Sequence, residues 1–223
     1  MKKYLLIGGI VLVKLAGNAT AAVVVVDSDW TVDTAITEGN TVGITTSETF
    51  SGLSSGAITD VSVDLDISGG YNAGLYGYLV LQDANGNTAT EILLNHIGVS
   101  SSNPFGSSGA GMNVTLSDSG TVNGSIHNAP GTPTGIWQPD SASTLDGTFG
   151  GLTANGTWTL YLADLTSGGG TSTLNSWGLD VSVISVPEAS LTGWVSGVTL
   201  LGFVAGGAWL QCLRRKSQVP KAI

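Results

Sequence analysis

The stretch "TWTLYLADLTSGGGTSTLNSWGLDVSV", residues 157–183, decides the fold class. Side chains that alternate between apolar and polar lie on opposite faces of a β-strand, because the side-chain period of a strand is two residues. The Gly-rich middle of the stretch predicts a loop between two such strands. The inward positions are Trp158, Leu160 and Leu162 in the first strand and Trp177, Leu179, Val181 and Val183 in the second.

The same alternation occurs upstream. "DVSVDLDI" (60–67) places four aliphatic residues on one face, and "LYGYLVLQ" (75–82) turns Tyr76 and Tyr78 outward. An Asx-rich turn at 83–87 leads into "TATEILL" (88–94). Short alternating strands separated by turn residues predict an all-β fold, a β-sandwich with one core.

The charges of the 223-residue chain are unevenly distributed. The formal net charge is −9, and no Lys or Arg lies between Ala22 and Pro187. That interior holds every Asp and Glu except Glu188. A body without bases cannot neutralise phosphates, which excludes nucleic acid as a partner. The one cysteine, Cys212, excludes a disulfide within the chain.

The first 21 residues have the pattern of a signal peptide. Lys2 and Lys3 precede an apolar run, and Ala19-Thr20-Ala21 offers a small-x-small cleavage site. We expect cleavage after Ala21; the alternative is an uncleaved anchor.

Residues 191–213 predict one transmembrane helix. The segment has no charged residue, and 23 residues at 1.5 Å each can span about 30 Å of hydrocarbon. The basic cluster that follows predicts a cytoplasmic C-terminus by the positive-inside rule. Its members are Arg214, Arg215 and Lys216.

The junction before this helix resembles the PEP-CTERM sorting signal, with a Pro-Glu pair, one helix and a terminal basic cluster. The resemblance implies recognition by an exosortase, a membrane transpeptidase that would release the protein from its helix. Ala189 stands where that family has a second proline. The alternative is a plain linker to a permanent anchor. The sorting residues are Val186, Pro187, Glu188, Ala189 and Ser190.

The body resembles the P domain of kexin- and furin-like proprotein convertases over about residues 36–183. "NGTW" (155–158), Asp164 and "LNSW" (174–177) match the closing signature of that family. The resemblance implies a jelly-roll β-sandwich. In the family this domain supports a subtilisin-like protease, whose Gly-Thr-Ser-Met nucleophile segment is absent from this sequence.

The sequence offers little for catalysis. "GSSGAG" (106–111) misses the G-x-S-x-G elbow because Ala110 stands where Gly is needed. Two histidines, His96 and His127, lie 31 positions apart without a zinc-type motif. We therefore expect a non-enzyme, and the alternative is a hydrolase whose site is not visible in the sequence.

Calcium is the candidate cofactor, because crowded carboxylates that have no Lys or Arg beside them must use backbone N–H groups, water or a cation. A solvated acidic surface is the alternative. The candidate ligands are Asp64, Asp66, Asp83, Asp118, Asp164 and Asp180.

The sequence thus predicts a signal peptide (1–21), an N-terminal extension (22–35), a P-domain-like sandwich (36–185), a sorting motif (186–190), a transmembrane helix (191–213) and a basic cytoplasmic tail (214–223). We expect export through the inner membrane of a Gram-negative bacterium, transient anchoring, and sorting to the surface or extracellular matrix. The expected function is a non-catalytic binding or structural module associated with exopolysaccharide. The alternative within this class is an accessory domain for a separate protease.

Overall fold

The computed structural model describes residues 22–53 and 56–185 of the chain. The expected signal peptide, sorting motif, transmembrane helix and basic tail lie outside these residues. Within them, no helix has the length and apolar character needed to cross a membrane.

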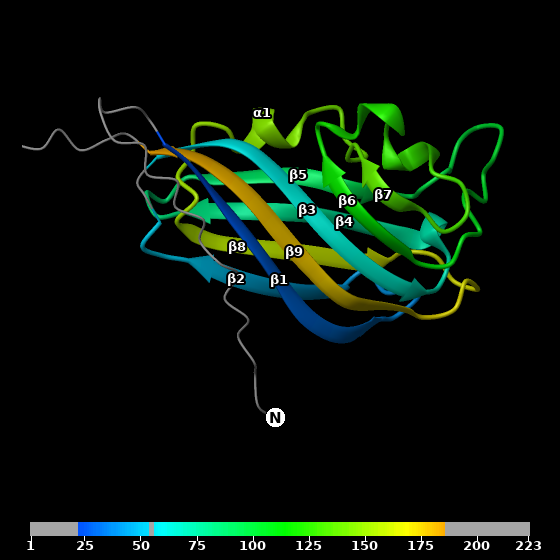
Figure 1. Cartoon of the computed structure of the whole chain (residues 1–223). Helices are drawn as coiled ribbons and strands as arrows, with labels where there is room; N and C mark the ends of the chain where they lie inside the picture. The colour runs from blue at the N-terminus through cyan, green and yellow to red at the C-terminus, as the bar shows by residue number, and fades with distance from the viewer. Residues whose placement is uncertain (1–21, 54–55, 186–223) are drawn as a thin grey trace, which may run out of the picture. The chain divides into compact units, whose positions relative to one another are not determined.

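The described residues form two packed β-sheets, which confirms the all-β sandwich (Figure 1). The first sheet has the order β1-β9-β3-β6-β7. Its pairs are antiparallel except for β6 and β7, which are parallel. The strands are β1 (Ala22–Ile36), β3 (Ala57–Gly69), β6 (Met112–Ser117), β7 (Thr134–Trp137) and β9 (Ser172–Ser185).

The second sheet is antiparallel and has the order β2-β8-β4-β5. The turn predicted at 83–87 joins β4 to β5, as the Asx residues there indicated. Its strands are β2 (Ile44–Phe50), β4 (Leu75–Asp83), β5 (Thr88–Asn95) and β8 (Gly156–Asp164).

The long connections hold the few helical turns. One α-helix, α1 (Leu145–Phe149), buries Leu145 and Phe149. The carboxylate of Asp118 accepts hydrogen bonds from the first backbone N–H groups of this helix, which have no partner within the helix. Three 3₁₀ turns complete the described elements: η1 (Asn72–Gly74), η2 (Gly120–Val122) and η3 (Ile126–Asn128).

The core between the sheets contains the predicted inward residues. Trp158 is 0% exposed and Trp177 is 1% exposed. The Trp158 ring packs against Phe149 of α1 at 5.1 Å, and its indole N–H donates to Ala154 O. The inward assignment of both tryptophans is therefore confirmed.

The segment expected as an N-terminal extension, residues 22–35, differs from that expectation. It forms β1, which pairs with β9 from Ala22↔Ser185 to Ile36↔Ser172. Trp30 packs on Phe50 of β2 at 5.9 Å, and Ile36 is fully buried. The sandwich therefore begins near residue 22, because these apolar side chains belong to its core.

Candidate functional site

The outer face of the second sheet carries tyrosines and hydroxyl groups, and among the described residues of its four strands no acidic or basic side chain lies on it. We call it the tyrosine–threonine face. Alternation turns its residues away from the core, since their strand neighbours Leu79, Leu81, Trp158 and Leu160 are buried. The face consists of Thr45, Ser47 and Thr49 of β2, Thr157, Thr159 and Tyr161 of β8, Tyr76, Tyr78, Val80 and Gln82 of β4, and Thr88, Thr90 and Ile92 of β5.

Three tyrosines lie together on this face. Tyr78 and Tyr161 are opposite each other on β4 and β8, with ring centroids 4.7 Å apart and an angle of 19° between the planes. Tyr76 meets Tyr78 edge-on at 6.1 Å. The Tyr161 hydroxyl donates to Thr41 O at 2.6 Å, which fixes the ring. The stack leaves one side of each ring uncovered by the other.

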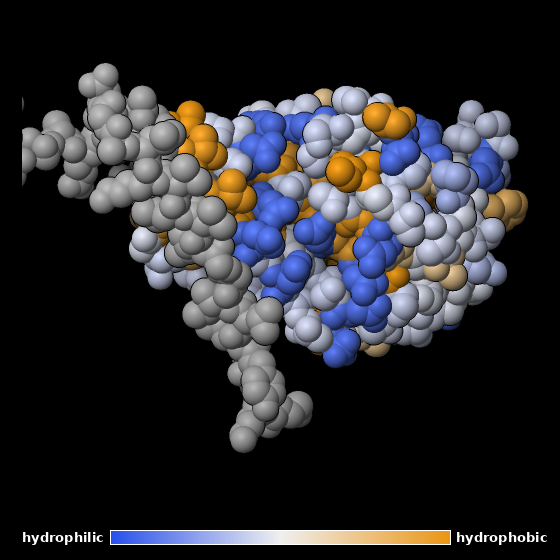
Figure 2. Space-filling view, viewed as in Figure 1, coloured by the Kyte–Doolittle hydropathy of each residue, from blue (hydrophilic) through white to orange (hydrophobic). Residues whose placement is uncertain are grey.

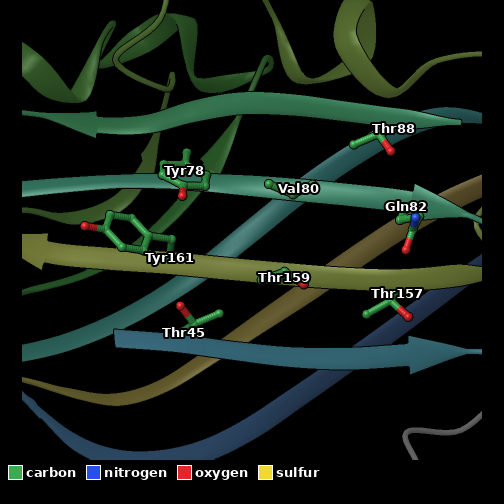
Figure 3. Close-up of a pocket in the computed structure, with 8 residues that line it drawn as sticks. All are labelled: Thr45, Tyr78, Val80, Gln82, Thr88, Thr157, Thr159 and Tyr161. Carbon is green, nitrogen blue, oxygen red and sulfur yellow. The ribbon is translucent and has the colours of Figure 1, made fainter. Parts of the chain in front are cut away.

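A shallow pocket of about 330 Å³ lies on this face beside the tyrosine stack. Figure 3 shows Tyr78 and Tyr161 at one end, Gln82 and Thr157 toward the other, and Thr159 between them on β8. The volume is at the lower end of the range of ligand pockets, about 300–1,000 Å³. Aromatic and hydroxyl groups thus converge on one open pocket.

Neighbouring hydroxyl groups on the face are hydrogen-bonded in pairs. Ser47 Oγ lies 2.8 Å from Thr159 Oγ1, and Thr49 Oγ1 lies 3.1 Å from Thr157 Oγ1. Each hydroxyl has a second lone pair, so a bonded pair can still accept from a ligand. The sequence indicated outward Tyr76 and Tyr78, but it did not indicate that Tyr161 stacks on Tyr78.

The outer face of the first sheet has the opposite character, and hydrophilic residues gather there over β1, β9 and β3 (Figure 2). Asp27 lies opposite Asp180, and both Asp29 and Asp64 lie opposite Gly178. A Cβ at Gly178 would collide with the Asp29 carboxylate, so glycine makes room for this acid. We call these four aspartates the acidic face.

Burial and neighbouring carboxylates raise the pKa values of two aspartates of the acidic face. Burial first, and then the charges of Asp27, Asp64 and Asp29, raise the pKa of Asp180 to about 6. Burial and the charges of Asp64 and Asp27 likewise raise the pKa of Asp29. The repulsion between the carboxylates contributes to these two raised pKa values because no Lys or Arg of the sheet offsets it.

The structure brings two of the calcium candidates, Asp64 and Asp180, to the acidic face. Asp66 lies on the same strand face as Asp64, and its carboxylate accepts from Asn175 at 3.1 Å. Among residues 22–53 and 56–185, no three His, Cys, Asp or Glu side chains are placed to hold a metal ion together. Calcium therefore stays a prediction.

The other three candidates lie apart and have protein partners. Asp83 accepts three hydrogen bonds in the β4–β5 turn, two of them from Asn87, and these bonds lower its pKa. Asp118 caps α1. Asp164 is 1% exposed and accepts from Thr166, but burial raises its pKa. In this structure these three carboxylates hold turns and a helix end.

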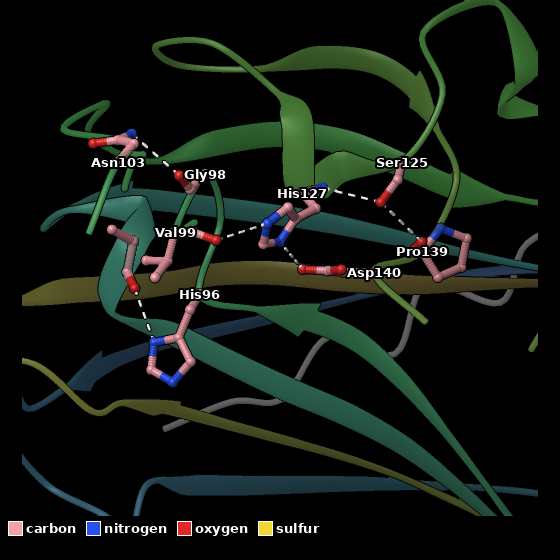
Figure 4. Close-up of polar contacts among 9 residues, drawn as sticks. His96, Gly98, Val99, Asn103, Ser125, His127, Pro139 and Asp140 are labelled. Carbon is pink, nitrogen blue, oxygen red and sulfur yellow. Dashed lines mark hydrogen bonds and ion pairs between the residues drawn. The ribbon is translucent and has the colours of Figure 1, made fainter. Parts of the chain in front are cut away.

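Both histidines hold loops (Figure 4). His127 Nδ1 lies 2.8 Å from Asp140 Oδ2, and its Nε2 lies 3.1 Å from Val99 O. Two acceptors favour the doubly protonated ring, and Asp140 is the main cause of a raised His127 pKa. His96 Nδ1 lies 3.0 Å from Ala73 O. Neither histidine lines the pocket of the tyrosine–threonine face.

No protein-family model matches the chain, and no curated protein matches it. Among solved structures, a chain in the crystal structure of the Aeromonas sobria serine protease with its chaperone is similar, with a TM-score of 0.44 and 16% identity. That match covers 74% of this chain and 27% of the other. The crystal structure of the Aeromonas sobria serine protease is similar with a TM-score of 0.43 and 16% identity. That match covers 73% of this chain and 27% of the other. This chain thus spans little more than a quarter of the length of either match.

Proposed function

We propose that this chain is an exported, non-catalytic jelly-roll module, similar to a P domain, that binds polysaccharide through its tyrosine–threonine face. The observation that carries the proposal is the Tyr78–Tyr161 stack beside a hydroxyl-lined pocket. Aromatic side chains supply a large apolar surface at low cost in conformational entropy, and sugar rings present C–H faces that pack on such surfaces.

The polar part of the pocket suits the same ligand class. Sugar hydroxyls both donate and accept hydrogen bonds, as do the hydroxyls of Thr157 and Thr159. The Gln82 amide adds two donors and an acceptor at the rim. Few convergent polar groups beside an apolar wall are typical of small-molecule and carbohydrate pockets.

The chemistry of the pocket supports a binding role and not a catalytic one. Its described lining consists of Thr, Tyr, Val and Gln, with no carboxylate, histidine or cysteine. A glycosidase needs two carboxyl groups on either side of the scissile bond. The acids of these strands lie elsewhere: Glu91 and Asp164 are buried on the inner side, and Asp83 is held in the β4–β5 turn. Glu48 of β2 lies opposite the buried Trp158 and so belongs to the inner side as well.

Export and sorting are the second half of the proposal. The segment at 1–21, the Pro187-Glu188 junction, the apolar run at 191–213 and the basic cluster beyond it support passage through the inner membrane. Exosortase cleavage would then release the module to the surface or matrix of a Gram-negative bacterium. There it would meet exopolysaccharide.

The test is binding to exopolysaccharide purified from the producing bacterium, measured by isothermal titration calorimetry. The full chain is used in a detergent that has no sugar headgroup. Tyr78→Ala and Tyr161→Ala should each weaken binding by about five- to tenfold, the equivalent of about 1–1.5 kcal/mol for one aromatic contact. Tyr71→Ala, which removes an exposed tyrosine away from the face, should leave binding unchanged. Equal binding by all four proteins would contradict the proposal.

A further inference from the structure

We infer that the polysaccharide taken by the tyrosine–threonine face is neutral, and that polyanionic chains are rejected. This inference rests on the proposed function and specifies its ligand class. The structural basis is the separation of charge between the two outer faces of the sandwich.

The second sheet keeps its carboxylates off its outer face. Glu48 of β2 lies opposite the buried Trp158, and Asp164 of β8 is 1% exposed, so both belong to the inner side of the sheet. Glu91 lies on β5 but points inward, where it is 1% exposed and accepts from Ser143 and Thr148. Asp83, at the end of β4, is 4% exposed and is held by Asn87. The described lining of the pocket therefore presents hydroxyl, amide, aromatic and aliphatic groups to a ligand, and no charged group.

A polyanion would find no counter-charge on this module. Recognition of carboxylate, sulfate or phosphate relies on Arg, Lys or backbone N–H groups, and residues 22–187 contain no Arg or Lys. The N–H groups of β8 and β4, the two central strands under the pocket, are already used, because each of these strands lies between two others in the sheet. A bound anionic sugar would lose hydration and gain no ion pair.

The acidic face adds repulsion over a longer range. Two packed sheets are about 10 Å apart, and groups on the two outer faces are farther apart than the sheets themselves. That separation exceeds the Debye length of about 10 Å at 0.1 M salt but is comparable to the Debye length of about 30 Å at 0.01 M salt. A chain of anionic sugars approaching the tyrosine–threonine face at low salt therefore feels Asp27, Asp29, Asp64 and Asp180 through the sandwich. A neutral chain does not, so its binding should not depend on salt.

The experiment compares neutral and anionic probes on the full chain with its seven Lys and Arg residues replaced by Gln. All seven lie outside residues 22–187, so the replacement leaves the module to decide whether a polyanion binds. EDTA is present so that no divalent cation bridges two anions. The neutral probes are cellohexaose, laminarihexaose and mannohexaose, and the anionic probe is polygalacturonate. Calorimetry is run at about 0.01 M and about 1 M NaCl, where the Debye length is about 30 Å and about 3 Å. We expect at least one neutral hexasaccharide to bind with the same affinity at both salts, and polygalacturonate not to bind at low salt.

Two results would overturn the inference while leaving a polysaccharide function in place. One is tighter binding of polygalacturonate than of every neutral probe, and the other is neutral binding that weakens as salt rises. If the chain binds its own exopolysaccharide but none of the three neutral probes, the neutral class is likewise wrong. Failure of both the exopolysaccharide and all four probes with a folded protein would remove the proposed function itself.

A charge-insertion pair makes the test independent of the choice of sugar. Gln82→Lys adds one cation at the pocket rim, and Asn113→Lys adds the same charge on the outer face of the first sheet. Only Gln82→Lys should gain polygalacturonate binding, and salt should abolish that gain. Equal gains from both variants would show that net charge, and not the character of this face, excludes polyanions.

Discussion

Trp30 of β1 lies directly opposite Trp177 of β9, and the two indole rings are 4.8 Å apart. The pair joins the first described strand of the chain to the last. The same ladder pairs Ala22 with Ser185, which are the first and the last residues that the structure describes. The N-terminal strand is therefore part of the module's core and not a leader to it.

Truncating either tryptophan should destabilise the sandwich. Trp177→Ala, at a 1% exposed position, should lower the free energy of unfolding by about 3–5 kcal/mol, as for other large-to-small core changes. Trp30→Ala should cost less, because Trp30 is only partly buried. Urea unfolding followed by circular dichroism measures both. Thr31→Ala, on the exposed side of β1, is the control, and a Trp30→Ala midpoint equal to that of Thr31→Ala would contradict the role of β1.

Asp180 should make the protein less stable as pH rises through weakly acidic values. Its pKa is about 6 in the folded state and near 3.8 when unfolded, so the folded state binds the proton more tightly. Its contribution to stability is therefore lost between about pH 3.8 and about pH 6, and is constant above that.

Asp180→Asn should make the urea midpoint less dependent on pH over this range and should raise the midpoint at neutral pH. Asp27→Asn should shift the transition to lower pH, because the charge of Asp27 raises the pKa of Asp180. Asp33→Asn removes an equal charge from an exposed position of β1 outside this group and serves as the control. A wild-type midpoint that rises steadily from pH 4 to pH 6, with no change in Asp180→Asn, would show that the acidic face is not coupled.

Calcium should raise the melting temperature if it occupies the acidic face. Binding to the native state adds RT ln(1 + [L]/Kd), which NaCl of the same ionic strength does not supply. The Asp64→Asn, Asp180→Asn double variant should lose the calcium-specific part of the shift. Equal shifts with CaCl₂ and NaCl would leave only screening of the carboxylates.

Cleavage at the Pro187-Glu188 junction should remove the apolar segment from the mature protein. Replacing both residues with Ala should leave membrane insertion intact, since residues 191–213 and the basic cluster are unchanged, and should trap the full chain in the inner membrane. Mass spectrometry of the exported protein from its own host shows whether the mature protein still contains residues 191–213. A Gln218→Ala variant is the control, and a wild-type product that still contains Trp194 and Trp209 would mean a permanent anchor.

The sequence by itself determined the local features of this protein. Alternation alone predicted strands at 60–67, 75–82 and 157–163. It also predicted that Trp158 and Trp177 face the core and that Tyr76 and Tyr78 face outward. These predictions succeeded because strand periodicity and turn chemistry are properties of a few consecutive residues. The missing bases between Ala22 and Pro187 are likewise visible without any structure.

Only the tertiary structure decided which strands are neighbours. In β1, "AVVVVDSDWTVDTAI", the first half has apolar residues on both faces of the strand and so shows no alternation. Its partner β9 lies at the other end of the described chain, so the sequence alone predicted an extension here. The Tyr78–Tyr161 stack and the pKa of Asp180 depend in the same way on cross-strand register. Register follows from how two sheets fill one core, and residues far apart in sequence set it together. That is why the chemistry of both outer faces appears only once the strands are paired.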